Sequence, residues 1–530
     1  KANSGINENG GTIIINGGNI HAKGQDSASA IGECGYDTVT QSPSSEGRQC
    51  GSITINGGIV RTEALARETT GTSIGIGSCR SGYGGSVTIN GGTVMANAFN
   101  DAICTGRGGS ITINGGDITA RGGLGRYGRG NGIGPSWITY ADITINGGNI
   151  DASANGAGAA IGGVLSTTVK ITGGTIKAVG DYATVAIGSN EGRGGSVSIT
   201  GGRISATAIG GAAGIGGANV WKTEKYTENA SLLITVGEIY ASADGNGAAI
   251  GGTSNLDYGS ITIIGNVIKS LTSESGPCIG ASADKSVGDI TITDANLPLF
   301  NCKYNLIGGN PLEEGNKILI QNSRVMSVNG NDTYLGISVG NNGTLIVLKN
   351  SEIHTCGIYM KCAGTLKKVE ITDCTVVTGA MIGGNADNAA VGEIVIRGSS
   401  ISMADDHYSN RCCIGSGKYA AFKSIDIQDS KLHLPVAVDA SAIGGGWYTS
   451  FTEDARIRIA NSTVDATTYR MCPAIGAGYH ATGDATLEII IENSNVIAKG
   501  GTLRSGSSGT YVPGIGKDSY SKWLNVKIQI

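Results

Sequence analysis

Two pairs of adjacent acidic residues in the C-terminal half of the chain could carry out acid–base chemistry. Asp405 and Asp406 are followed directly by His407, and Glu453 and Asp454 form the second pair. Hydrolysis of a glycosidic bond requires two carboxyl groups, one as the acid and the other as the base or nucleophile. Carboxylate oxygens are also ligands that calcium prefers, and acidic residues in loops often serve only solubility. The pattern leaves these three interpretations open, with Asp405 and Asp406 as the first candidates for catalysis.

Aromatic side chains recur at one place in the last part of the chain. Each follows, by four or five residues, the isoleucine of a repeated motif in which a small residue precedes Ile and Gly usually comes after it. Aromatic rings offer apolar surfaces that suit sugar rings, and a flat row of rings suits a linear polymer. A ladder of rings that only packs a loop is the alternative. The candidate substrate-binding residues are Tyr419, Trp447, Tyr448, Tyr479, His480 and Tyr520.

A histidine and an aspartate, His433 and Asp465, occupy the same outward position of two successive repeats. Their side chains are expected to form a hydrogen bond, which would orient the imidazole ring. No serine or cysteine nucleophile is evident beside them, so a surface pair is favoured over a catalytic one.

We expect a structural repeat to position these residues, because one short sequence recurs along the chain. Residues 110–120 read SITINGGDITA. Ile111 and Ile113 alternate with polar residues, which is the period of a strand with one buried face. Asn114 and two glycines then end the run, since Gly adopts backbone angles that a residue with a Cβ resists. Related stretches begin at Ile15, Ile55, Ile89, Ile145, Ile171 and Ile199.

The repeat predicts an all-β fold, a single right-handed parallel β-helix solenoid with three short strands per coil. Stacked coils make three parallel sheets with inward Ile, Val and Ala, and the hand follows from the crossover rule. The small-Ile-Gly motif predicts about 17 coils of roughly 30 residues. We interpret 1–530 as one continuous β-helix, with regular Gly-rich coils in 1–290 and more divergent coils with aromatic and acidic loops in 291–530. The turn asparagines are expected to stack and to hydrogen-bond along the axis.

Composition and charge limit the classes of molecule that the chain is expected to bind. The chain has 530 residues, 90 of them Gly, and a net charge of −4. This balance offers no electrostatic reason to bind nucleic acid, and no apolar run is long enough for membrane insertion. No cofactor is expected, apart from calcium as the open alternative. The chain begins at Lys1 without a signal peptide, as expected of a mature or trimmed fragment.

The 12 cysteines lack the CxxC spacing of zinc sites. Cys34 and Cys79 each follow a repeat isoleucine by three residues, so neighbouring coils would bring them within disulfide distance. A disulfide between them and two separate thiols remain equally open. Most of the other cysteines are expected to be small buried apolar residues.

The paired ITINGG and AIGGG motifs cover nearly the whole chain, and they resemble a known family. The pattern is similar to the pectin-lyase-like β-helix superfamily, and more narrowly to Gly-rich repeats of bacterial surface proteins often described as carbohydrate-binding. The resemblance implies an extracellular or cell-surface bacterial protein that binds polysaccharide or glycan, as an adhesin or a carbohydrate-binding module. The alternative is a polysaccharide-degrading enzyme, a glycoside hydrolase or lyase. Neither the polygalacturonase signatures nor a clear pectate-lyase calcium and arginine set is present, so no catalytic residue can be transferred.

Overall fold

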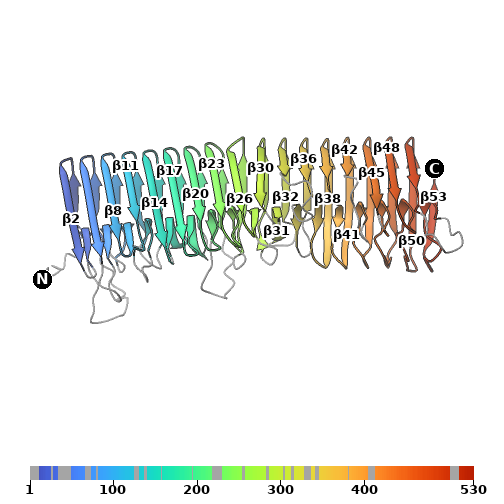
Figure 1. Ribbon diagram of the computed structural model, residues 1–530, viewed down its shortest axis with the longest axis horizontal. Coiled ribbons are helices and arrows are strands. Elements are labelled where there is room, and N and C mark those ends of the chain that lie inside the picture. The colour runs from blue at the N-terminus through green and yellow to red at the C-terminus, as the bar shows by residue number, and fades with distance from the viewer. Residues whose placement is uncertain are drawn as a thin grey trace. The chain divides into compact units, whose positions relative to one another are not determined.

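The computed structural model shows the chain as a succession of β-strands, and no helix occurs among the described residues (Figure 1). The residues described are 11–25, 28–33, 49–65, 73–78, 82–124, 130–135, 140–156, 158–193, 195–217, 230–253, 257–281, 286–302, 305–311, 316–327, 336–340, 345–379, 381–403, 412–437, 439–501 and 512–530. The chain divides into two compact units, Lys1–Val287 (unit 1) and Gly288–Ile530 (unit 2). Each unit is described by itself.

Unit 1 is made of coils with three strands each, so every third strand belongs to the same sheet. Its first sheet contains β1 (Thr12–Ile15), β4 (Ser52–Ile55), β7 (Ser86–Ile89), β10 (Gly109–Ile113), β13 (Ala141–Ile145), β16 (Thr168–Ile171), β19 (Ser196–Ile199), β22 (Ser231–Ile234) and β25 (Ser260–Ile264). Its second sheet contains β2 (Asn19–Gln25), β5 (Ile59–Leu65), β8 (Thr93–Ala98), β11 (Asp117–Arg121), β14 (Asn149–Asn155), β17 (Thr175–Asp181), β20 (Arg203–Ala208), β23 (Glu238–Ala243) and β26 (Ile268–Ser273). Its third sheet contains β3 (Ser29–Glu33), β6 (Ile74–Ser78), β9 (Asp101–Thr105), β12 (Ile133–Pro135), β15 (Ala159–Leu165), β18 (Val185–Arg193), β21 (Ile215–Gly217), β24 (Ile250–Gly251) and β27 (Pro277–Gly280), and the short strand β28 (Ser286–Val287) follows.

Unit 2 repeats this arrangement. Its first sheet contains β29 (Ile290–Thr293), β32 (Lys317–Gln321), β35 (Leu345–Lys349), β38 (Gly364–Thr372), β41 (Ala389–Arg397), β44 (Phe422–Gln428), β47 (Ala455–Ala460), β50 (Thr486–Glu492) and β53 (Asn525–Gln529). Its second sheet contains β30 (Asn296–Cys302), β33 (Arg324–Ser327), β36 (Glu352–Thr355), β39 (Thr375–Thr378), β42 (Ser400–Met403), β45 (Lys431–Ala437), β48 (Thr463–Thr468) and β51 (Asn495–Lys499). Its third sheet contains β31 (Asn305–Pro311), β34 (Ile337–Val339), β37 (Ile358–Met360), β40 (Ile382–Gly384), β43 (Ile414–Gly415), β46 (Ile443–Gly444), β49 (Ile475–Gly476) and β52 (Ile515–Gly516).

Neighbouring strands in each sheet of a unit are parallel, and equivalent residues of the repeat lie side by side. In unit 1, Ile111 pairs with Val87 on one side and with Ile143 on the other. In unit 2, Ile443 pairs with Ile414 and Ile475. Figure 1 shows successive second-sheet strands such as β8, β11, β14 and β17 side by side. These registers confirm a parallel β-helix solenoid with three strands per coil.

The buried side chains follow the predicted alternation. Ile111 and Ile113 are fully buried, whereas Ser110 and Thr112, which alternate with them, are only half-buried. Unit 2 has the same pattern at Ile457 in β47, which is fully buried. The inward aliphatic ladders supply the apolar burial that stabilises a coil, and each coil obtains most of it from its neighbours.

A tight turn joins the first strand to the second, and the two units build it from different residues. In unit 1 the second Gly of NGG has a positive φ, for example +88° at Gly58. A Cβ there would lie 2.6 Å from the carbonyl oxygen of Gly18 in the preceding coil, so only Gly fits without a shift. In unit 2 the left-handed conformation comes one residue earlier in the turn, usually at an asparagine or aspartate, as at Asn322 and Asn461 (φ +49° at both), because these residues tolerate it best after Gly.

The predicted asparagine ladder is present at this turn. The side-chain amide of Asn56 donates to Asn16 at 2.7 Å, Asn90 donates to Asn56 at 2.7 Å, and Asn114 donates to Asn90 at 2.7 Å. Asn146 continues the series by donating to Asn114 at 2.8 Å. Each interior amide therefore both donates and accepts along the stack.

The turns of unit 2 contain a serine ladder that the sequence analysis did not predict. The backbone N–H of Ser399 donates to the hydroxyl oxygen of Ser430 at 3.1 Å, and the N–H of Ser430 donates to Ser462 at 3.1 Å. Each hydroxyl in turn donates to a carbonyl two residues earlier, at 2.6 Å for Ser430 and the Gln428 carbonyl. These buried serines satisfy turn amides that would otherwise lack a partner.

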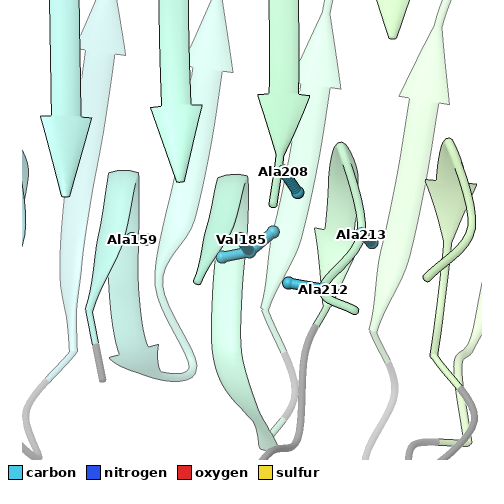
Figure 2. Packing of buried hydrophobic residues seen from close by; sticks show 5 residues of the cluster. All are labelled: Ala159, Val185, Ala208, Ala212 and Ala213. Atoms are coloured by element: carbon cyan, nitrogen blue, oxygen red, sulfur yellow. The ribbon is translucent and has the colours of Figure 1, made fainter. Parts of the chain in front are cut away.

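Small residues fill the corner that leads into the third sheet of unit 1. Figure 2 shows the side chains of Ala159, Val185, Ala208, Ala212 and Ala213 around this corner, and all five are fully buried. Small side chains such as alanine fit the narrow interior of this corner, which explains the preference for Ala before the repeat isoleucine.

The cysteines within the described residues are mostly buried, as predicted. Cys50, Cys104, Cys374 and Cys472 belong to this buried set, and Cys362 is half-buried. Cys34 and Cys79 lie outside the described residues, so the disulfide between them stays a prediction.

Candidate functional site

The predicted aromatic residues lie in unit 2, where each coil leaves its third strand and turns toward the first strand of the next coil. Backbone hydrogen bonds hold these corners in register. The N–H of Tyr419 donates to the Trp447 carbonyl at 2.9 Å, and the N–H of Tyr448 donates to the Tyr479 carbonyl at 2.8 Å. Trp447 and Tyr479 also form a parallel bridge. The corners therefore bring side chains from successive coils together.

Four of the rings form one row, which we call the aromatic column: Tyr419, Tyr448, His480 and Tyr520. The ring centroids of Tyr419 and Tyr448 are 5.6 Å apart, and those of Tyr448 and His480 are 5.2 Å apart. His480 and Tyr520 follow at 4.9 Å. The planes of the first two pairs differ by only 14° and 24°, so these rings stack nearly parallel with an offset.

Trp447 and Tyr479 flank the column. Trp447 lies nearly parallel to Tyr448, at 5.4 Å between centroids, and Tyr479 meets His480 edge to face at 4.2 Å. The ammonium nitrogen of Lys418 lies 4.4 Å from the Tyr419 ring centroid and 5.2 Å from that of Trp447. A side-chain hydrogen bond with Tyr419 raises the pKa of Lys418, so this end of the column stays cationic at neutral pH.

The tyrosine rings of the column reach the solvent. Tyr419 is 45% exposed, Tyr448 is 39% exposed and Tyr520 is 42% exposed. Trp447 is half-buried, and its indole N–H is inaccessible and has no hydrogen-bond partner among the described residues. Because the rings stack on one another, their faces are largely covered by neighbouring rings. What the column presents outward is a row of ring edges and phenol hydroxyl groups.

The backbone at three successive corners has a left-handed conformation that bulky residues seldom adopt. φ is +62° at Tyr419, +55° at Tyr448 and +53° at His480. For a residue with a Cβ this costs about 1–2 kcal/mol. Asn388 occupies the same place in the preceding coil, with φ +59°, since its N–H donates to the Lys418 carbonyl. An asparagine would thus meet the backbone requirement at lower cost than the tyrosines do.

A buried aspartate that the sequence analysis missed supports the column from behind. Asp518 is 3% exposed, and one carboxylate oxygen accepts the backbone N–H of His480 at 3.2 Å. Its other oxygen accepts a hydrogen bond from the Ser521 hydroxyl, and that hydroxyl oxygen accepts the N–H of Ala481 at 2.9 Å. The signal was present in the sequence, because Asp518 stands three residues after the motif isoleucine, where the three preceding coils have Gly.

Of the four candidate catalytic acids, Glu453 and Asp454 lie within the described residues. Asp405 and Asp406 lie outside them, so their role stays a prediction. Asp454 accepts the backbone N–H of Thr486 at 2.7 Å and so fixes the start of β50. Glu453 is exposed beside it. No group of three or more His, Cys, Asp or Glu side chains that could hold a metal ion occurs in the part of the chain that is described.

The predicted pair of His433 and Asp465 is present. The two residues are register partners in β45 and β48, and Nδ1 of His433 lies 3.3 Å from a carboxylate oxygen of Asp465. Both side chains are well exposed. The geometry fits the surface pair that the sequence favoured.

Comparison with known proteins gives no assignment, because no family model, no curated protein and no solved structure matches the chain. Within the described residues, no helix is long and apolar enough to cross a membrane. The aromatic column and its surroundings are therefore the basis for a functional proposal.

Proposed function

We propose that the chain is a glycan-binding solenoid of the pectin-lyase-like type, displayed outside a bacterial cell, and that the aromatic column is its binding surface. One observation carries the proposal: three successive corners hold a bulky aromatic residue in a left-handed backbone conformation. Strain of this kind concentrates at functional sites, because packing alone would favour a residue without the cost. An adhesin or a carbohydrate-binding module fits such a surface.

The stacked geometry indicates how the glycan would be held. The phenol hydroxyls of Tyr419, Tyr448 and Tyr520 donate to and accept from sugar hydroxyl groups. The exposed rims of the rings between them add only nonspecific apolar contact with the sugar. Coils repeat about every 4.8 Å along a parallel sheet, so the column offers similar contacts at regular intervals to a linear chain. Lys418 adds a cationic group at one end.

The alternative is a polysaccharide-degrading enzyme that uses Asp405 and Asp406, with or without Glu453 and Asp454. No geometry among the described residues favours it, since Asp454 is engaged in a structural hydrogen bond. It is kept as a separate outcome of the experiment below.

The test is binding and cleavage on a panel of plant, microbial and host polysaccharides. Retention is measured by affinity electrophoresis, and released products are measured by mass spectrometry. We expect retention on at least one glycan without cleavage, weakened about tenfold or more by Tyr448→Ala. Tyr469→Ala is the matched control, because Tyr469 is 63% exposed in the same unit but is not part of the column.

Three other results would refute the proposal in different ways. Equal retention of the wild type and Tyr448→Ala would remove the column from binding. Released oligosaccharides that disappear in the Asp405→Ala/Asp406→Ala variant would establish the enzyme. Neither retention nor cleavage on the whole panel would leave a structural role for the solenoid.

A further inference from the structure

A second exposed cluster lies in unit 1, and no sequence motif pointed to it. Tyr83, Arg107 and Tyr140 come from three successive coils, each from the segment before a first-sheet strand. The guanidinium carbon of Arg107 lies 5.6 Å from the Tyr83 ring centroid and 5.7 Å from the Tyr140 ring centroid. All three side chains are exposed. The cation is therefore held between two aromatic rings at the surface.

The backbone fixes this arrangement. Tyr83 and Arg107 form a parallel bridge, and the N–H of Gly108 donates to the Tyr140 carbonyl at 2.8 Å. The Tyr140 ring packs on Gly108, where a Cβ would lie 3.4 Å from the ring. The Thr105 hydroxyl anchors the neighbouring segment by donating to the Gly84 carbonyl at 3.1 Å. The cluster is thus formed before any ligand arrives.

The charge of Arg107 is not neutralised within the described residues, where no carboxylate lies within ion-pair distance of it. Two other arginines of unit 1 are paired with carboxylates. Arg121 contacts Asp151 at 2.6 Å, and Arg203, which also lies over a tyrosine ring, contacts Glu238 at 3.0 Å. Arg107 thus has two ring neighbours and no acid partner within the described residues, and an external anion would neutralise its charge.

We propose that Tyr83, Arg107 and Tyr140 form an oxyanion-recognition site for an acidic polysaccharide, in which Arg107 binds a carboxylate or sulfate substituent of the sugar. This site is separate from the aromatic column and does not depend on the function proposed for it. The rings lie beside the guanidinium and leave N–H groups for two parallel hydrogen bonds to the oxyanion. The tyrosine rings then contact the apolar part of the same sugar and its neighbours.

A polysaccharide fits better than an acidic peptide or a nucleic acid. The cation is single and the chain carries a net charge of −4, so long-range attraction of a dense polyanion is weak. Recognition must therefore come from short-range contacts on both sides of the anion. Two tyrosines at neighbouring coils supply such contacts to a chain of rings that runs along the stack.

The experiment measures binding of the full chain to four polymers by isothermal titration at low ionic strength. Alginate supplies carboxylates on sugar rings, dextran sulfate supplies sulfates, dextran is the neutral control, and polyglutamate supplies carboxylates without sugar. We expect Arg107→Ala to weaken binding to alginate or dextran sulfate about tenfold, and Arg107→Lys to weaken it less, because the charge remains but the planar fork is lost. Whichever polymer shows the loss identifies the oxyanion.

Arg203→Ala is the matched control, since that arginine also lies over a tyrosine ring but is already paired with Glu238. Tyr83→Ala is expected to weaken polysaccharide binding without affecting polyglutamate. Unchanged binding of both acidic polysaccharides by Arg107→Ala would overturn the proposal, as would their failure to bind the wild type. An equal loss for neutral dextran, or a larger loss for polyglutamate, would also overturn it. A Tyr448→Ala variant keeps this site intact, so failure of one proposal is distinguishable from failure of the other.

Discussion

Replacing Tyr448 by asparagine should separate the stability of the aromatic column from its proposed function. The substitution relieves the left-handed backbone, which costs a tyrosine about 1–2 kcal/mol. It also removes the stacking contacts with Tyr419, Trp447 and His480, at 5.6 Å, 5.4 Å and 5.2 Å between centroids, which are worth about 0.5–1.5 kcal/mol each. The relief of backbone strain offsets only part of this loss. We therefore expect a net destabilisation of no more than about 3 kcal/mol, or a fall in Tm of no more than about 3 °C for a chain of 530 residues.

The assay compares thermal unfolding and glycan retention of the wild type, Tyr448→Asn and Tyr448→Phe. Tyr448→Phe keeps the ring and loses the hydroxyl, so it should unfold like the wild type and bind more weakly. Tyr448→Asn should remain folded and lose retention about tenfold or more. A destabilisation above about 4 kcal/mol would show that the ring holds the corner together and that the strain argument is wrong. Full retention by both variants would remove the hydroxyl row from binding.

The remaining predictions concern the scaffold. Asn114→Ala removes two hydrogen bonds of the asparagine ladder, and Asn16→Ala removes one. The first substitution should lower the free energy of unfolding by about 1–2 kcal/mol and the second by about half of that. Equal decreases in urea titrations would contradict a stabilising role of the ladder. Gly444→Ala should destabilise by about 3 kcal/mol or more, because φ is +132° and the added Cβ would lie 1.9 Å from a carbonyl oxygen of the next coil. A Tm within about 1 °C of the wild type, which for 530 residues is the effect of about 1 kcal/mol, would exclude that clash. A hydrogen bond with Glu274, burial and repulsion raise the pKa of Asp244, so the folded state holds this proton longer than the unfolded chain does, and stability is lost as the pH rises through the folded-state pKa. Asp244→Asn should therefore reduce the fall in Tm as the pH rises above about 4, and an unchanged profile would contradict this origin.

Much of the fold could be predicted from the sequence alone, because the same strand and turn signals recur along the chain. Alternating residues such as Ile111 and Ile113 indicate a strand with one buried face, and the glycines after Asn114 indicate where it turns. Every repeat isoleucine identified from the small-Ile-Gly motif lies in a strand of the third sheet. The physical reason is that both signals are local. Alternation of apolar and polar residues indicates which side chains are buried, and Gly indicates a backbone angle that other residues resist.

The site was predicted only in part. The stacking order of the aromatic column followed from counting residues after each motif isoleucine. The orientation of the rings did not, since it depends on the left-handed backbone at Tyr448 and its equivalents. That conformation is held by hydrogen bonds to the next coil, and at His480 by the buried carboxylate of Asp518.

What the sequence determined by itself is the coil: three strands, aliphatic residues inward, and turns that require Gly, Asn or Ser. What only the tertiary structure decided is which side chains of different coils become neighbours. Asn388 stands six residues after its motif isoleucine and Tyr419 stands five after its own, yet the hydrogen-bond ladder places them at the same corner. Loops of unequal length likewise separate Tyr83, Arg107 and Tyr140 along the chain. They lie close together because stacking of the coils aligns the strands, and the connecting segments accommodate the differences in length.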